Sequence, residues 1–232
     1  FFYIDTLQPG TNEFVLNEDT SKHVVQVLRM QNGQQLNLTD GRGNIFTACI
    51  TDDHKKRCTV SILSENYQPP PEKIITIAIS PVKNTSRFEW FLEKATEIGV
   101  HEIIPLVCER TEKQHLRMDR LRGILVSAML QSQQCRLPVL QEPTRFEDLA
   151  VRQFENGKKF IAHCLPEGNK ESLLDKNSQS SNQLILIGPE GDFTHEEIQL
   201  ALRQLYVPVT LGENRLRTET AGVVAATLLS IR

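Results

Sequence analysis

The sequence lacks the features that mark several classes of protein. Its 232 residues contain no apolar run that approaches the ~20 residues needed to cross a bilayer, so we expect no membrane partner. The first residues, 1–5, have no basic segment followed by an apolar stretch and do not resemble a secretory signal. The five cysteines are scattered without Cys-x-x-Cys spacing, and the six histidines are equally dispersed. We therefore expect no metal and no disulfide framework, and a cytoplasmic protein with reduced thiols.

An overall excess of basic residues is also missing. The net charge is −3 and the pI is about 6.1, which argues mildly against a nucleic-acid partner. The local distribution matters more, because phosphate contacts require only one basic face. Residues 108–136 contain six basic and three acidic side chains, so this stretch is either a solvated helix face or a surface for phosphate contacts.

Residues 1–68 have the pattern of a small β-rich domain. The turn cluster 37–44 lies between two apolar runs and predicts a hairpin, and 59–63 predicts a further strand. Only 22–30 has helical spacing. Several short strands with one small helix favour a compact barrel. Three consecutive prolines at 69–71 favour a stiff extended link, so we place a domain boundary there.

From Lys73 to the end, predicted strands alternate with predicted helices. This alternation is typical of an α/β domain, in which a parallel sheet is covered by helices. Gly99 is placed to cap the first helix, and Thr194 with Glu197 forms a capping box at the start of a later one. The expected strands are 74–79, 103–107, 159–164, 184–187 and 208–211, and the expected helices are 88–98, 119–134, 194–205 and 221–231.

Two segments near the C-terminus, 184–193 and 211–221, each run from an apolar strand through a glycine-containing loop into a helix. Ligands of α/β proteins bind where strand ends meet helix starts, so the two loops predict one shared pocket. Neither loop is a dinucleotide fingerprint or a phosphate loop. Taken singly, each is equally compatible with an ordinary strand-to-helix connection, in which Thr218 or Thr220 is only a helix cap.

Several short motifs occur together in a characteristic order. They are Val27-Leu28-Arg29, Lys83 with Arg87 and Glu89, 94–100, Arg110, Gln131-Ser132 with Leu137-Pro138, 188–191, Leu211-Gly212 and 216–221. In this combination the chain resembles the small-subunit (16S) ribosomal RNA uridine-N3 methyltransferase family of the SPOUT superfamily, over nearly its whole length.

The resemblance implies a PUA-like N-terminal β-barrel over 1–68 that binds RNA. It implies a SPOUT-type α/β domain over 73–232 with a parallel sheet and a trefoil knot. It further implies S-adenosyl-L-methionine as cofactor, a homodimer, and 16S ribosomal RNA of the small ribosomal subunit as substrate. The expected reaction is methylation of uridine N3. The alternatives are a related enzyme that methylates a ribose 2′-hydroxyl, and a non-catalytic ribosome-assembly factor that only binds RNA.

The chemistry of this reaction selects candidate residues. Uridine N3 must lose a proton, and a fixed arginine can stabilise the negative charge that develops on the base. We expect Arg217 in this role and Glu219 to orient Arg217 or to accept the proton. The resemblance implies cofactor contacts from Leu165, Pro166, Leu186, Gly188, Pro189, Gly191, Leu211, Gly212, Leu216, Thr218 and Ala221. It implies RNA contacts from Arg29, Lys83, Arg87, Arg110 and Arg136.

The chain departs from the family pattern at three positions. Asp192 stands where the family usually has a second glycine, and Arg215 stands where it often has Ile or Val. Gln134 stands where the family usually has an arginine that would contact RNA, and Arg136 is the basic residue that follows it. None of these changes removes a predicted ligand loop.

Overall fold

The computed structural model describes residues 1–113, 115–154, 156–165, 170–177 and 181–231. The chain divides into two compact units. The first consists of 1–70 together with 129–137, and the second of 71–128 together with 138–231 in the described part.

The N-terminal unit is built on a five-stranded sheet with the order β1-β3-β4-β5-β2. Strands β3, β4 and β5 form antiparallel pairs, so the hairpin predicted around 37–44 is confirmed. The short strand β1 pairs with β3 in parallel, and β2 closes the other edge against β5. The strands are β1 (Phe2–Tyr3), β2 (Glu13–Val15), β3 (Gln35–Thr39), β4 (Asn44–Asp52) and β5 (Thr59–Tyr67).

The helix of this unit begins earlier than its apolar spacing predicts. Helix α1 (Glu18–Lys22) follows Asn17, whose side chain accepts the Thr20 N–H, and a π-helical turn η1 (His23–Val27) continues it. The buried Ser21 hydroxyl accepts the Cys58 N–H at 3.0 Å, which fixes the helix to the sheet. The core beneath it contains Ile4, Leu7, Leu16, Val24, Leu36, Leu38, Phe46, Ala48, Ile50, Cys58 and Val60.

Residues 129–137 pack within this N-terminal unit, although the prolines at 69–71 suggested that they belong with the other domain. The Leu137 N–H donates to the Gly41 carbonyl at 2.8 Å, and the Gly43 N–H donates to the Cys135 carbonyl at 2.9 Å. The Arg136 guanidinium lies over the Tyr67 ring, 5.4 Å from its centroid. A backbone bridge of this kind is a long-range contact that no local sequence pattern reveals.

The C-terminal unit contains an eight-stranded sheet in which every pairing is parallel. Its order is β11-β13-β10-β12-β6-β7-β8, with β9 paired to β7. The α/β class predicted for this part of the chain is therefore confirmed. The strands are β6 (Ile75–Ile79), β7 (Glu102–Val107), β8 (Val139–Leu140), β9 (Thr144–Arg145), β10 (Gly157–Ala162), β11 (Glu171–Ser172), β12 (Asn182–Ile187) and β13 (Val207–Thr210).

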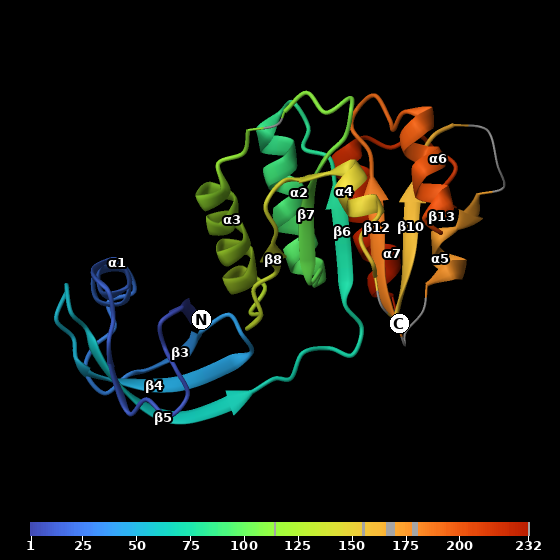
Figure 1. The fold of residues 1–232 in the computed structure, drawn as a ribbon. Helices are drawn as coiled ribbons and strands as arrows, with labels where there is room; N and C mark the ends of the chain where they lie inside the picture. Colours follow the sequence, from blue (N-terminus) through green and yellow to red (C-terminus); the bar gives the residue numbers. More distant parts are fainter. Residues whose placement is uncertain (114, 155, 166–169, 178–180, 232) are drawn as a thin grey trace. The chain divides into compact units, whose positions relative to one another are not determined.

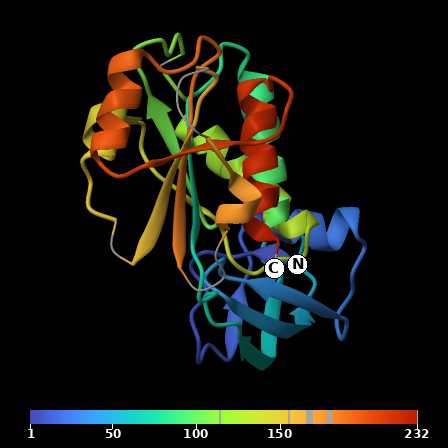
Figure 2. The same cartoon turned by 90° about the vertical axis from the view of Figure 1, so that its right-hand side faces the viewer.

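Helices cover both faces of this sheet. On one face, α7 (Thr218–Ser230) packs along α2 (Thr85–Ile98), as Figure 2 shows in red and green. A Cβ on Gly222 would lie 2.7 Å from the Ile79 side chain, so α7 lies directly on the sheet. The neighbouring residue Ala78 belongs instead to the cluster under α4 (Phe146–Ala150) and α6 (His195–Arg203). Successive strand residues point to opposite faces, which places these helix pairs on opposite sides (Figure 1).

The helix ends follow the predicted signals. Gly99 has a φ of 95° and ends α2, and Thr194 with Glu197 forms the capping box that begins α6. The two remaining helices are α3 (Met118–Gln131) and the short α5 (Leu173–Lys176). Among the described residues, none of the helices has the length and apolar character that a bilayer crossing requires.

Candidate functional site

The carboxyl ends of three neighbouring strands form the candidate site. Strand β10 lies between β12 and β13, and its last residue Ala162 is in register with Ile187 on one side and Val209 on the other. The glycine loops after β12 and β13 therefore flank the end of β10. A cavity of about 520 Å³ opens on the β12 side and one of about 400 Å³ on the β13 side. The cavities share Ala162, Cys164, Arg215, Leu216 and Ala221.

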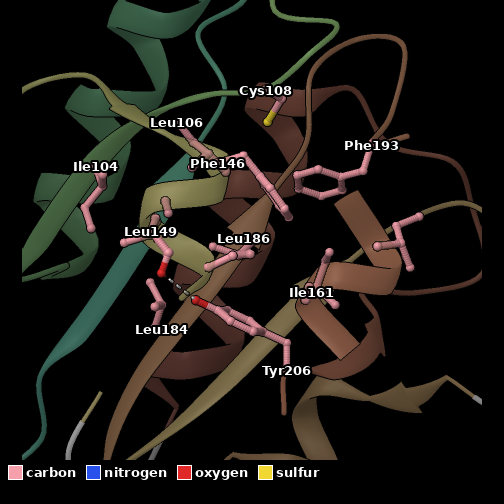
Figure 3. Close-up of a cluster of buried hydrophobic side chains, with 14 residues drawn as sticks. Ile104, Leu106, Cys108, Phe146, Leu149, Ile161, Leu184, Leu186, Phe193 and Tyr206 are labelled. Carbon is pink, nitrogen blue, oxygen red and sulfur yellow. Dashed lines mark hydrogen bonds between the residues drawn. The ribbon is translucent and has the colours of Figure 1, made fainter. Parts of the chain in front are cut away.

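The loop after β12 is anchored in the hydrophobic core. Phe193 is 1 % exposed, and its ring lies 5.4 Å from that of Phe146 within the cluster under α4 and α6 (Figure 3). A Cβ on Gly188 would stand 3.0 Å from the Phe193 ring. The loop thus folds back tightly over Gly188, and a side chain at this position would disturb the wall of the larger cavity.

Asp192 joins this loop to the end of β10. Its φ of 63° lies in the left-handed region, which explains why glycine suits this position and why Asp, one of the tolerated exceptions, occupies it here. One carboxylate oxygen accepts the Cys164 N–H at 2.8 Å, and the other accepts the Phe193 N–H at 2.9 Å. The departure from the family pattern therefore adds a contact between two walls of the site.

Arg110 holds the same loop from the other side. Its Nη1 donates to the Gly191 carbonyl at 2.7 Å and to the Phe193 carbonyl at 3.4 Å. Hydrogen bonds from a charged donor are stronger than neutral ones. The guanidinium that the resemblance assigned to RNA is thus in contact with the protein backbone.

The loop after β13 has fewer internal contacts. Gly212 has a φ of 143°, and the Thr210 hydroxyl donates to its carbonyl at 2.8 Å. Residues 212–215 are exposed. The loop is joined to the other one at its far end, where the buried Thr218 hydroxyl donates to the Gly188 carbonyl at 3.1 Å.

The Arg87 guanidinium forms ion pairs that link the start of α2, the start of α7 and the lining of the larger cavity. Arg87, near the start of α2, lines the cavity, and its Nε lies 3.7 Å from Glu219 Oε1. Its Nη1 lies 3.8 Å from Glu190 Oε1. Glu219 is only 6 % exposed and belongs to the first turn of α7, where the helix dipole favours a negative charge.

Glu219 does not pair with the residue that the sequence suggested. Within the described residues its ion-pair partner is Arg87, and its Oε2 is buried without a hydrogen-bond partner. Arg217 is exposed at the N-cap of α7 and lines the larger cavity. Arg217 and Glu219 thus lie at the same helix start but make separate contacts.

His163 lines the smaller cavity with Lys170, whose Nζ donates to the His163 carbonyl at 2.9 Å. Burial, together with the nearby Lys170 charge, lowers the pKa of His163, whereas Asp192 opposes this shift. The imidazole is therefore kept in its neutral form. The described ranges of the chain contain no cluster of His, Cys, Asp and Glu that could hold a metal ion.

Most of the predicted cofactor residues line these cavities. Gly188, Pro189, Leu216, Thr218 and Ala221 line the larger one, and Leu211, Gly212, Leu216 and Ala221 the smaller one. The other predicted residues lie elsewhere. Leu186 is fully buried in the hydrophobic cluster, Leu165 packs against that cluster, and Gly191 contacts Arg110. Pro166 lies outside the described residues.

The five predicted RNA-binding residues belong to both units: Arg29 and Arg136 to the N-terminal one, and Lys83, Arg87 and Arg110 to the C-terminal one. Arg29 is exposed with a φ of 55°, and Lys83 forms an exposed ion pair of 3.1 Å with Glu112. Arg87 and Arg110 contact the candidate site. Arg136 contacts the Gln68 carbonyl and the Tyr67 ring in the N-terminal unit.

Sequence reasoning missed the part of the site that comes from β10. Ala162, His163 and Cys164 form the wall between the two glycine loops, and Glu190, Asp192 and Lys170 also line the cavities. A signal was present, because a buried-type strand was predicted over 159–164. The position of that strand between β12 and β13 is a non-local property, and the sequence pattern does not specify it.

Known proteins share these features. A family model described as "RNA methyltransferase domain" matches residues 69–230, and one described as "RNA methyltransferase PUA domain" matches 16–63. The chain belongs to the RNA methyltransferase family. Its N-terminal unit is the PUA-like domain of that family, and its parallel sheet with the candidate site lies in the methyltransferase domain.

Individual relatives extend over nearly the whole chain. A probable rRNA-methyltransferase from Porphyromonas gingivalis has a crystal structure with a TM-score of 0.90 and 39% identity, covering 97% of this chain and 94% of that one. Ribosomal RNA small subunit methyltransferase E from Neisseria gonorrhoeae, whose structure is bound to S-adenosyl methionine, has a TM-score of 0.85 and 29% identity, with 97% and 94% coverage. Ribosomal RNA small subunit methyltransferase E from Rickettsia conorii is 27% identical over 96% of this chain and 91% of its own length.

Proposed function

We propose that this protein transfers a methyl group from S-adenosyl-L-methionine to N3 of a uridine in 16S ribosomal RNA of the small ribosomal subunit. The observation that carries the proposal is the pair of linked cavities at the ends of β10, β12 and β13, with the Arg217 side chain at the larger one. The names of the relatives support small-subunit ribosomal RNA as substrate, and the bound Neisseria structure supports the cofactor.

The residues of the site suit S-adenosyl-L-methionine. The smaller cavity is lined by Leu211, Gly212 and Leu216, and Gly212 has open space where a side chain would begin, so the backbone is accessible to a flat ring. Glu190 and Asp192 line the larger cavity and complement a positively charged ligand. When bound, the cofactor supplies a reactive methyl group on a sulfonium, so the protein mainly has to align it with the base.

The polar residues of the larger cavity then act on the uridine. N3 loses its proton, its electron pair forms the bond to the methyl carbon, and the methyl–sulfur bond breaks. Arg217 is exposed at the cavity and can donate to a base oxygen as negative charge develops there. Because N3 lies on the pairing edge of the base, the target must be unpaired or flipped out.

Glu219 is proposed to act with Arg87 rather than to orient Arg217. The 3.7 Å ion pair holds the Arg87 guanidinium at the cavity beside Glu190. The remaining oxygen of Glu219 is buried without a hydrogen-bond partner among the described residues, so its lone pairs are free to accept a hydrogen. We propose Glu219 as the proton acceptor, directly or through a water.

Further parts of the proposal concern assembly and fold. We propose a homodimer in which α7 meets a second copy, because Val223, Val224 and Leu228 stay partly exposed along a mostly apolar helix. Light scattering at micromolar concentration tests this, and a monomer would contradict it. The trefoil knot implied by the resemblance is retained as part of the same proposal.

The decisive experiment combines purified protein, S-adenosyl-L-methionine and small subunits from a strain that lacks the enzyme. Mass spectrometry of digested ribosomal RNA should show 3-methyluridine. A ribose-methylated nucleoside would favour the 2′-hydroxyl alternative. Calorimetry that detects RNA binding without cofactor binding would favour a non-catalytic assembly factor.

A further inference from the structure

A further cavity, which is basic, lies in the C-terminal unit away from the two already described. Its volume is about 280 Å³. The first turns of α2 and α3 and the segment before α3 surround it, and most of its polar residues are cationic or carry a hydroxyl group. They are Thr85, Ser86, Glu89, Lys113, His115, Leu116, Arg117, Arg120 and Leu121.

The acidic side chains around this cavity already have partners. Glu89 receives hydrogen bonds from Arg120 Nε at 2.5 Å and Nη2 at 2.8 Å. Glu112 pairs with Lys83 at 3.1 Å, and Asp119 pairs with Arg122 at 3.7 Å.

Lys113 and Arg117 line the cavity without such a partner. In the part of the chain that the structure describes, neither side chain forms an ion pair or a side-chain hydrogen bond. Glu89 is the one carboxylate that lines the cavity, and Arg120 neutralises it. Two positive charges are therefore left over, which is an arrangement suited to an anion.

The position of the cavity relative to the candidate site indicates which anion. Ser86 lines the basic cavity, and the next residue, Arg87, lines the larger cavity of the candidate site. Consecutive residues of an α-helix point about 100° apart, so the first turn of α2 separates two adjoining sites. A ligand that suits both cavities has its reacting group in the candidate site and a negative charge beside it, in the basic cavity.

We propose that the basic cavity binds a backbone phosphate of the RNA substrate, close to the nucleotide whose base enters the candidate site. The Lys113 ammonium and the Arg117 guanidinium neutralise the phosphate, and the Thr85 and Ser86 hydroxyls can donate to its oxygens. This inference rests on the proposed function, because it takes RNA as the substrate. It adds RNA contacts to those expected of Arg87, Arg110 and Arg136, whose guanidiniums also contact the protein itself.

The test replaces both unpaired cations, in the variant Lys113→Gln/Arg117→Gln. The matched control, Arg152→Gln/Arg203→Gln, removes the same charge from two exposed arginines elsewhere in the same unit. Affinity for a 16S ribosomal RNA fragment is measured by fluorescence anisotropy from 50 to 250 mM KCl. The slope of log affinity against log salt should fall by about one for each lost phosphate contact, hence by about one in the variant, which loses the single phosphate, and little in the control.

Further measurements separate the possible outcomes. Calorimetry should give unchanged S-adenosyl-L-methionine affinity, and unchanged thermal unfolding would show that the variant folds. A salt slope equal to that of the control overturns the proposal. So does a variant that loses stabilisation by inorganic phosphate but keeps the wild-type RNA slope, because the cavity would then be a site for a free anion.

This test is independent of the methylation assay. A fall in the slope in a protein that produces no 3-methyluridine would retain the phosphate site and reject the proposed reaction. Production of 3-methyluridine with an unchanged slope would retain the proposed reaction and reject the phosphate site. The variant Lys113→Gln/Arg117→Lys retains one positive charge in the cavity. It should recover part of the salt slope, because a phosphate also accepts a point charge.

Discussion

The loops after β12 and β13 each contain a glycine within two residues of the end of a parallel strand, yet the protein supports them differently. The β12 loop is fixed by the buried Phe193 ring, by Arg110 on two of its carbonyls and by Asp192 on the end of β10. The β13 loop is exposed over 212–215 and has its own contacts mainly at Thr210. Few buried contacts mean low local stability. The comparison indicates a preformed wall on one side and an adaptable wall on the other.

This difference suggests a division of tasks in the proposed enzyme. A preformed wall fixes the position of a ligand before it binds, which reduces the ordering cost of association. An adaptable wall can enclose the ligand afterwards, and it carries Arg217 at its end. The predictions below test this contrast, beginning with the largest expected effect.

Arg217 should be the most sensitive residue of the adaptable side. Arg217→Lys keeps the charge but removes the planar fork that can contact two groups at once. We expect turnover to fall by roughly 10²-fold or more, the scale observed when a donor that stabilises developing charge is lost, with nearly normal S-adenosyl-L-methionine affinity. Arg217→Ala should be at least as slow. A single-turnover assay with isolated small subunits measures this. Near-wild-type rates in both variants would show that Arg217 does not take part in the reaction.

Valine at the two loop glycines should distinguish the walls directly. In Gly188→Val the new side chain meets the Phe193 ring at 3.0 Å in a packed region, so both cofactor affinity and stability should fall, the latter by about 1–3 kcal/mol. In Gly212→Val there is open space, but the φ of 143° is unfavourable for valine. Because the exposed loop can relax to relieve this strain, cofactor affinity should fall while the melting temperature decreases less than in Gly188→Val. Equal losses of stability in both variants would contradict the contrast between the walls.

The sequence predicted the elements that depend on local patterns. The strand β12 contains the apolar run 184–187, the capping box at Thr194 is a four-residue signal, and Gly99 ends α2 where expected. The glycine loops were also recognisable, because a strand that runs into a glycine and then a helix is visible in a short window. Most of the residues chosen there do line the cavities.

The parts that were missed depend on long-range contacts. Nothing near Arg87 in the sequence indicates that it pairs with Glu219, and nothing near Arg110 indicates a bond to Gly191. A basic residue predicts a positive charge but not its partner, so the sequence did not indicate that Arg87 and Arg110 contact the protein. The return of 129–137 to the N-terminal unit and the two-residue strands β8, β9 and β11 have no periodic pattern that could reveal them.

Asp192 offers a smaller test of the preformed wall. Asp192→Gly keeps the left-handed backbone and removes the carboxylate that accepts the Cys164 N–H. One exchanged hydrogen bond with a charged acceptor contributes about 1.5–3 kcal/mol when shielded, so at this partly open site we expect less than a tenfold loss of cofactor affinity. Asp192→Asn keeps both the conformation and an acceptor oxygen and should be nearly normal. Calorimetry on both variants checks this. If Asp192→Gly binds the cofactor as tightly as the wild type and Asp192→Asn do, the link to β10 is dispensable.

The smallest expected effect concerns His163 beside the adaptable wall. Burial lowers the pKa of His163 in the folded protein below its ordinary value of 6.5. The folded state therefore favours the neutral imidazole, and its contribution to stability is present above about pH 6.5 and decreases as the pH falls through the lowered folded pKa. The melting temperature should decrease between pH 7.5 and 5.5, and less so in His163→Gln. The exposed His195 in the same unit provides the control, because His195→Gln should keep the wild-type pH dependence. If His163→Gln and His195→Gln respond identically to pH, the imidazole is not buried in solution, and the β13 side of the site is more open than the structure shows.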